Sequence, residues 1–161
     1  MKILYIFLLA VFSVGCNSGN SKTEQLKDVE SEFKKAISEI SPKESSISPI
    51  YMVIPRAGCS GCISDAELYM TNYLNKNPKN GKITFILTEF DDEKIIRARF
   101  DTLLSRKEVL VDRGDKIGAN NLLKSIYPSL YFFDKTGQLR DVGAFSPSTD
   151  GQGSIEKYLQ N

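Results

Sequence analysis

Hydrophobic residues in this chain fall into short apolar runs that alternate with stretches of helical spacing. Two short, mostly apolar runs, Ile50 to Ile54 and Lys82 to Thr88, have the length and composition of buried strands. Between them, apolar positions from Ile63 to Leu74 recur at helical spacing, which predicts an amphipathic helix ending near Asn75. A further helix is predicted over residues 91–107, because its first turn is acidic and its last turn is basic.

The remaining pattern adds elements at both ends. Apolar residues from Thr23 to Ile40 predict an amphipathic helix that packs on the domain or serves as a spacer, with a partner-binding helix as the alternative. The segment Ser41 to Pro49 is rich in Ser and Pro, as linkers are. The other expected elements are a strand at Glu108 to Val111, a helix at Lys116 to Ser125, a hairpin from Pro128 to Phe145 that turns at Lys135 to Gly137, and a final helix at Ile155 to Leu159.

This order of elements predicts an α/β fold with a parallel βα start, right-handed crossovers and an antiparallel edge. The length of 161 residues allows one ordinary domain and an appendage. We expect a signal peptide at residues 1–15, a tether with an amphipathic helix at 16–47, and the domain at 48–161.

The first residues, MKILYIFLLAVFSVGC, have the layout of a secretory signal: one basic residue, an apolar run and small residues. The run is shorter than the roughly 20 residues of a membrane-spanning helix, and the alternative is a buried N-terminal helix. The end of this segment resembles a bacterial lipobox, which implies acylation of Cys16 and a lipoprotein facing the periplasm or the cell exterior. The alternative is a soluble secreted protein.

Charge and composition exclude several kinds of chemistry. The net charge is +1, so no basic excess indicates a nucleic-acid partner. The chain contains no His, which removes His general bases, Ser-His-Asp and Cys-His catalysis, and His-ligated metals. Only three cysteines are present, too few for a four-thiolate metal site, and we expect no metal and no cofactor.

Cys59 and Cys62 form a Cys-x-x-Cys pair where a predicted buried strand gives way to a predicted helix. The free N–H groups and partial positive charge at a helix N-terminus stabilise a thiolate, the form that attacks disulfides. A structural disulfide would close only a very short loop, and two thiolates without His leave a metal shell incomplete. These two alternatives remain, but the position favours a redox dithiol.

Together with the segment IYPSLYFFDKTGQL, in which Pro128 heads an apolar strand, the CSGC pair resembles the thioredoxin superfamily from about Ile50 to Leu159. The stretch from Val109 to Gln138, with Asp112 after a short strand, is similar to the redoxin branch of membrane-tethered extracytoplasmic thioredoxin-like proteins. The resemblance implies a central mixed sheet flanked by helices, with an extra helix and strand between Asp92 and Val111 and an N-terminal helix.

The same resemblance implies roles for five residues, and Arg56, a charge that the family pattern does not include, is a sixth candidate. Cys59 would be the attacking cysteine and Cys62 the resolving one. Pro128 would lie against them in cis, and Tyr127 would offer its backbone N–H and C=O to an extended partner segment. Asp65 would be a proton acceptor or, alternatively, a solvated acid at the start of the helix. Arg56 would lower the pKa of Cys59 or, alternatively, be a solvated loop residue.

Several family features are absent. Gly58 replaces the usual Trp before the first cysteine, and Met52 to Ile54 contains no acidic residue. The peroxidase Pro-x-x-x-Thr-x-x-Cys pattern is missing, and copper delivery would need a His.

The sequence therefore predicts a monomeric extracytoplasmic thiol–disulfide oxidoreductase. Its partners would be thiols or disulfides of exported proteins, a redox partner, and the membrane through the lipid anchor. The alternative is a non-catalytic peptide- or protein-binding lipoprotein on the same scaffold.

Overall fold

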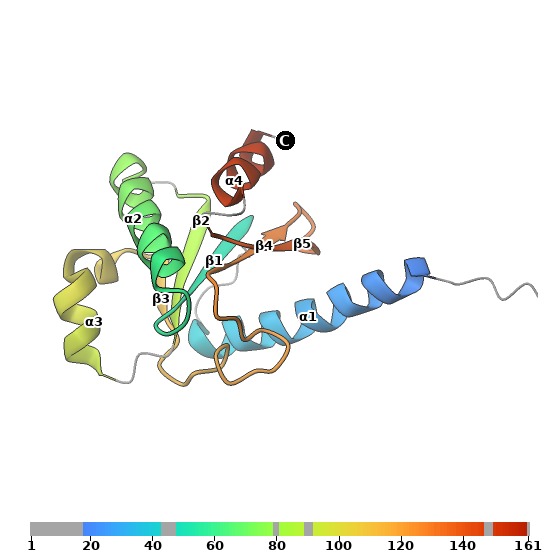
Figure 1. Cartoon of the computed structure of the whole chain (residues 1–161), viewed down its shortest axis with the longest axis horizontal. Coiled ribbons are helices and arrows are strands. Elements are labelled where there is room, and N and C mark those ends of the chain that lie inside the picture. The colour runs from blue at the N-terminus through green and yellow to red at the C-terminus, as the bar shows by residue number, and fades with distance from the viewer. Residues whose placement is uncertain (1–17, 43–47, 79–80, 89–91, 147–149, 161) are drawn as a thin grey trace, which may run out of the picture.

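The computed structural model describes residues 18–42, 48–78, 81–88, 92–146 and 150–160. Within these residues, five strands form one sheet with α-helices on both of its faces (Figure 1). In chain order the elements are α1 (Ser18–Ile40), β1 (Ile50–Pro55), α2 (Ser60–Lys76), β2 (Ile83–Thr88), α3 (Glu93–Phe100), the 3-10 helix η1 (Asp101–Ser105), β3 (Val109–Val111), β4 (Ser129–Phe133), β5 (Leu139–Ala144) and α4 (Gly151–Gln160).

The strands lie in the order β3-β2-β1-β4-β5. β1 pairs in parallel with β2, and β2 with β3, while β4 runs antiparallel to β1 and β5 antiparallel to β4. At the centre of the sheet, Met52 lies between Phe85 of β2 and Leu130 of β4. Every residue of β1, β2 and β4 is buried, as expected for strands covered on both faces. The predicted fold class, with its antiparallel edge and extra helix and strand, is confirmed.

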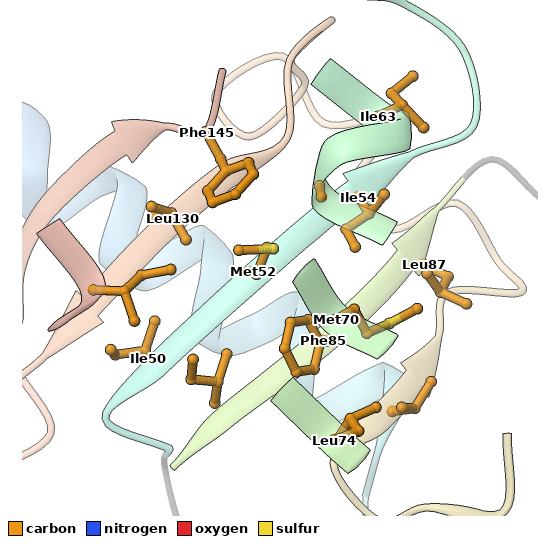
Figure 2. Packing of buried hydrophobic residues seen from close by; sticks show 14 of the residues in the cluster. Ile50, Met52, Ile54, Ile63, Met70, Leu74, Phe85, Leu87, Leu130 and Phe145 are labelled. Atoms are coloured by element: carbon orange, nitrogen blue, oxygen red, sulfur yellow. The ribbon is translucent and has the colours of Figure 1, made fainter. Parts of the chain in front are cut away.

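One face of the sheet packs against α2, α3 and α4. Alternate residues of β1 (Ile50, Met52 and Ile54) point to this face, because successive side chains of a strand point to opposite sides. Met70 and Leu74 of α2 cover them, and Figure 2 shows the apolar side chains meeting between helix and strands. This core fixes α2, and therefore the cysteines at its start, against the end of β1.

The other face of the sheet packs against α1. Phe33 of this helix is 1% exposed and stacks on Tyr131 of β4 with ring centroids 4.1 Å apart. Its ring also meets Tyr51 of β1 edge to face at 5.2 Å. The Glu30 carboxylate accepts a hydrogen bond from the Leu139 N–H at 3.1 Å. Of the three interpretations of this helix, packing on the domain is the one that these contacts confirm.

The segment between β3 and β4 differs from the prediction of a helix at Lys116 to Ser125. It forms two separate turns that meet at Asn120, whose N–H bonds back to the Ile117 carbonyl and whose side chain accepts from the Leu122 N–H. Gly118 and the Asn pair disfavour a continuous helix. Asp112, which is 1% exposed, starts the first turn by accepting from the N–H groups of Lys116 and Ile117.

The predicted hairpin is confirmed as β4 and β5. Gly137 has φ +76°, a conformation that glycine adopts without strain, and its N–H bonds to the Asp134 carbonyl. The Asp134 carboxylate accepts from Thr136 and Gln138, and these hydrogen bonds, with the Thr136 hydroxyl first, hold its pKa well below the usual value.

Among the described residues, no helix has the length and hydropathy needed to cross a membrane. The predicted signal peptide and Cys16 lie outside the described residues.

Candidate functional site

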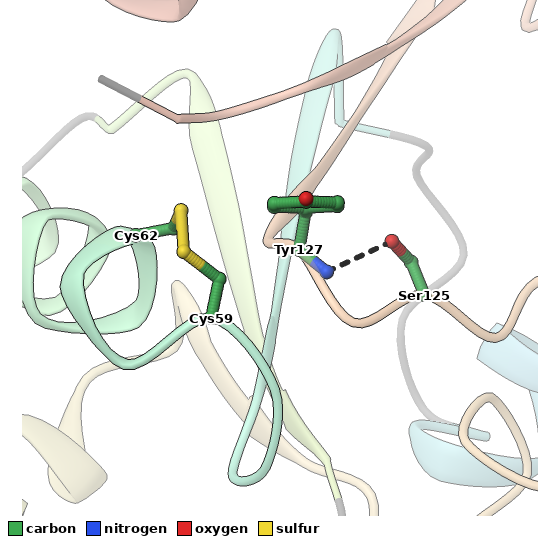
Figure 3. The surroundings of a disulfide bond; sticks show 4 residues. All are labelled: Cys59, Cys62, Ser125 and Tyr127. Atoms are coloured by element: carbon green, nitrogen blue, oxygen red, sulfur yellow. Dashed lines mark hydrogen bonds between the residues drawn. A yellow bond between two sulfur atoms is a disulfide. The ribbon is translucent and has the colours of Figure 1, made fainter. Parts of the chain in front are cut away.

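The two cysteines lie at the start of α2, as the sequence predicts. β1 ends at Pro55, a short loop follows, and Cys59 is the N-cap residue of the helix. Cys59 and Cys62 are joined by a disulfide with a Cα–Cα distance of 5.3 Å (Figure 3). The Cys59 carbonyl accepts the first helical hydrogen bond, from Ile63 N at 2.9 Å. The preceding apolar strand therefore delivers the pair directly to a helix N-terminus.

Burial differs between the two cysteines. Cys59 is half-buried, whereas Cys62 is only 3% exposed. The first N–H groups of a helix have no hydrogen-bond partner inside the helix and carry a partial positive charge. In α2 these groups lie next to Cys59. A thiolate formed at Cys59 would be stabilised there and reachable from outside. Cys62 is shielded, and one helical turn places it within reach of Cys59.

A second segment, residues 125–128, lies next to the cysteines and directly precedes β4, the neighbour of β1 in the sheet. The Cys59 N–H donates to the Ile126 carbonyl at 2.9 Å. Gly58 has φ +139°, and a Cβ at this position would lie 2.1 Å from the Ile126 oxygen. Only glycine fits this close approach. Gly58, at a position where the resemblance noted in the sequence implies a Trp, therefore has a local structural reason.

Tyr127 lies beyond the last pair of the β1–β4 ladder. That ladder ends at the pair Val53 and Ser129, and its register would bring Pro55 opposite Tyr127. Because Pro55 has no N–H, it cannot donate a hydrogen bond to Tyr127, and the β1–β4 ladder does not continue through this pair. Tyr127 is 40% exposed and lies beside the disulfide (Figure 3).

Both backbone groups of Tyr127 already have hydrogen-bond partners within the protein. Its N–H donates to the Ser125 Oγ at 3.1 Å, drawn as the dashed line in Figure 3. Its carbonyl accepts from the Ser129 Oγ at 3.2 Å. The sequence interpretation named the backbone of Tyr127 but missed these two serines. A Ser two residues before an exposed N–H is the pattern that could have found the first of them.

The expectation that Pro128 is cis is wrong. No peptide bond between described residues is cis, so the bond from Tyr127 to Pro128 is trans. Trans is the lower-energy form by about 0.5–1 kcal/mol for a bond preceding proline. The Pro128 carbonyl accepts from the Phe145 N–H at 2.7 Å, which joins this residue to the end of β5.

Asp65 and Arg56 are both exposed. Asp65 lies one turn beyond Cys62 and lines a hollow of about 580 Å³ between α2 and α4. Arg56 is in the loop between β1 and Cys59. Their predicted roles in proton acceptance and in tuning the thiolate stay predictions.

The described ranges contain no group of three His, Cys, Asp or Glu side chains able to hold a metal ion. The arrangement can perform thiol–disulfide exchange: a half-buried sulfur at a helix N-terminus, a shielded second sulfur one turn later, and an exposed backbone segment beside both.

Comparison with known proteins gives structural likenesses alone. No protein-family model and no curated protein matches the chain. A protein assigned as a thioredoxin from Neisseria meningitidis is 15% identical with a TM-score of 0.46, covering 71% of this chain and 77% of that one. The exposed lipoprotein thioredoxin of Streptococcus pneumoniae is 20% identical with a TM-score of 0.42, covering 71% and 86%. A peroxiredoxin-like protein from Aquifex aeolicus is 11% identical with a TM-score of 0.41, covering 71% and 73%. These identities and scores are too low to assign the chain to a family or an activity.

Proposed function

We propose that this chain is an exported, membrane-anchored thiol–disulfide oxidoreductase that exchanges disulfides with partner proteins through Cys59 and Cys62. The observation that supports this most is the unequal burial of the pair at a helix N-terminus. The half-buried sulfur of Cys59 can meet the disulfide of a partner protein. The shielded sulfur of Cys62 can attack only the mixed disulfide that Cys59 then forms with that partner.

In the reduced protein, the Cys59 thiolate attacks one sulfur of a partner disulfide. A mixed disulfide forms, and the other partner sulfur leaves as a thiolate. Cys62 then loses its proton and attacks the Cys59 sulfur, which releases the second partner thiolate and forms the disulfide seen here. Two electrons pass from the protein to the partner, and the reverse sequence oxidises a partner dithiol. Asp65 would accept the Cys62 proton, and Arg56 would favour the Cys59 thiolate.

The proposed partners are thiols or disulfides of exported proteins, together with a redox partner that restores the working state of the dithiol. Acylation of Cys16 would hold the protein on a membrane, facing the periplasm or the cell exterior. Both proposals rest on the N-terminal sequence pattern.

Insulin reduction with dithiothreitol as electron source tests the activity. We expect turnover by the wild-type protein, and a fall to the uncatalysed rate for Cys59→Ala and for Cys62→Ala, because each removes one of the two sulfurs of the cycle. Asn75→Ala, an exposed change near the far end of α2, is the matched control and should keep wild-type turnover.

Two outcomes would contradict the proposal. Wild-type protein that catalyses neither insulin reduction nor the oxidation of a reduced protein would favour the non-catalytic binding lipoprotein. Turnover that survives Cys59→Ala would place the chemistry elsewhere.

In cells, the Cys62→Ala variant should accumulate mixed disulfides with partner proteins, because the attacking sulfur remains and the resolving one is missing.

A further inference from the structure

Three backbone groups lie next to the disulfide, just before β4, and the protein itself occupies all of them. The Ile126 carbonyl accepts from Cys59 N at 2.9 Å. The Tyr127 N–H donates to the Ser125 Oγ at 3.1 Å, and the Tyr127 carbonyl accepts from the Ser129 Oγ at 3.2 Å. The first bond holds the loop against the cysteines, whereas the other two are made by hydroxyl groups that can rotate away.

The Tyr127 groups are the ones that an extended polypeptide would need. Tyr127 precedes the first residue of β4 that pairs with β1. The β1 residue opposite Tyr127 would be Pro55, which has no N–H to donate. Tyr127 is 40% exposed and lies beside the disulfide. A polypeptide that adds to such a free strand end bonds through backbone N–H and C=O groups.

We propose that the Ser125 hydroxyl competes with extended polypeptides for the Tyr127 N–H, and so disfavours polypeptide disulfides relative to small disulfides that have no backbone. This inference rests on the proposed disulfide exchange at Cys59. Ser125 is a positioning residue, because it acts through Tyr127 and takes no part in the transfer of electrons.

The two serines should differ in effect. An N–H group is a single donor, so the Ser125 hydroxyl and a partner carbonyl exclude one another at the Tyr127 nitrogen. A carbonyl oxygen has two lone pairs, so the Tyr127 oxygen can accept from the Ser129 hydroxyl and from a partner N–H together. Competition is therefore expected mainly from Ser125, with Ser129 as the internal comparison.

The experiment measures oxidation of the reduced protein by two disulfides. One is a linear peptide dimer joined through a central cysteine, and the other is 2-hydroxyethyl disulfide, which has no backbone amide. In each case the Cys59 thiolate attacks a symmetrical disulfide, one thiolate leaves, and Cys62 displaces the second. Rates are fitted for the half-saturating concentration and the maximal rate.

For Ser125→Ala we expect the half-saturating peptide concentration to fall roughly two- to tenfold, the range that one net hydrogen bond gives, with little change in the maximal rate. At disulfide concentrations well below half-saturation, the ratio of peptide rate to hydroxyethyl disulfide rate should rise by the same factor. Ser125→Thr, which keeps the hydroxyl, should restore the wild-type ratio, and Ser129→Ala should change it less than Ser125→Ala. Amide hydrogen exchange at Tyr127 should become faster in Ser125→Ala, because the N–H loses its acceptor.

An unchanged or lowered ratio in Ser125→Ala overturns the inference, as does an equal change with both disulfides. If wild-type protein reacts with neither disulfide, it is the proposed function that fails, and the exchange rate at the Tyr127 amide still reports whether the Ser125 bond exists.

Discussion

Replacing Gly58 by Ala should lower the free energy of unfolding by about 2–4 kcal/mol, through backbone strain and overpacking together. Gly58 has φ +139°, which other residues rarely adopt, and the new Cβ would lie 2.1 Å from the Ile126 carbonyl oxygen. The clashing atoms belong to the backbone, so no side-chain rotation relieves the contact. The loop before β4 would have to move away from Cys59, and urea unfolding followed by circular dichroism would measure the loss.

Gly61 provides the matched control, two residues from Cys59 in the same short motif. A Cβ there would meet no atom within 4 Å, and the residue lies in the first turn of α2. Gly61→Ala should therefore leave stability unchanged or raise it by up to about 1 kcal/mol. A Gly58→Ala variant as stable as Gly61→Ala would show that the loop does not approach the cysteines as closely as described.

Replacing Phe33 by Ala should cost about 3–5 kcal/mol of unfolding free energy, the usual range for a fully buried Phe. The ring is 1% exposed and contacts three aromatic rings on the sheet, with centroid distances of 4.1 Å to Tyr131, 5.2 Å to Tyr51 and 5.7 Å to Phe133. Its removal would leave a cavity between α1 and the second face of the sheet. Equilibrium urea unfolding gives the difference directly.

Leu68→Ala is the comparison for this large effect. Leu68 is 61% exposed on α2, so its truncation should change the free energy of unfolding by no more than about 0.5 kcal/mol. If Phe33→Ala is equally mild, α1 is a detachable spacer, and the aromatic contacts contribute little to the stability of the domain.

Much of the fold follows from local sequence pattern. The runs Ile50 to Ile54 and Lys82 to Thr88 can be read as buried strands because they are short and consist mostly of apolar, β-branched and aromatic residues. The pair Cys59 and Cys62 can likewise be placed at a helix start, because an amphipathic stretch follows a strand there. In each case the residues that decide the structure are neighbours in the chain.

Three features were missed, and only the first of them depends on a contact between distant parts of the chain. The reason for Gly58 is the Ile126 carbonyl, 68 residues away, and sequence alone shows only that a Trp is absent. The predicted helix at Lys116 to Ser125 failed because Asp112 and Asn120 bond neighbouring backbone N–H groups and divide the segment into turns. The trans bond before Pro128 was missed because the resemblance, rather than any local pattern, implied cis.

The length of α1 has a consequence for how the domain would be presented. Its buried residues, Phe33 and Ala36, lie in the C-terminal half, and Figure 1 shows the N-terminal half projecting beyond the sheet. Leu26 already packs against the core, so the eight helical residues before it, 18–25, form the projecting part and span about 12 Å. If the chain were attached to a bilayer ahead of Ser18, this projecting helical segment would separate the domain from the membrane. Because Phe33 fixes the helix to the sheet, the orientation of the disulfide relative to the membrane would be restricted.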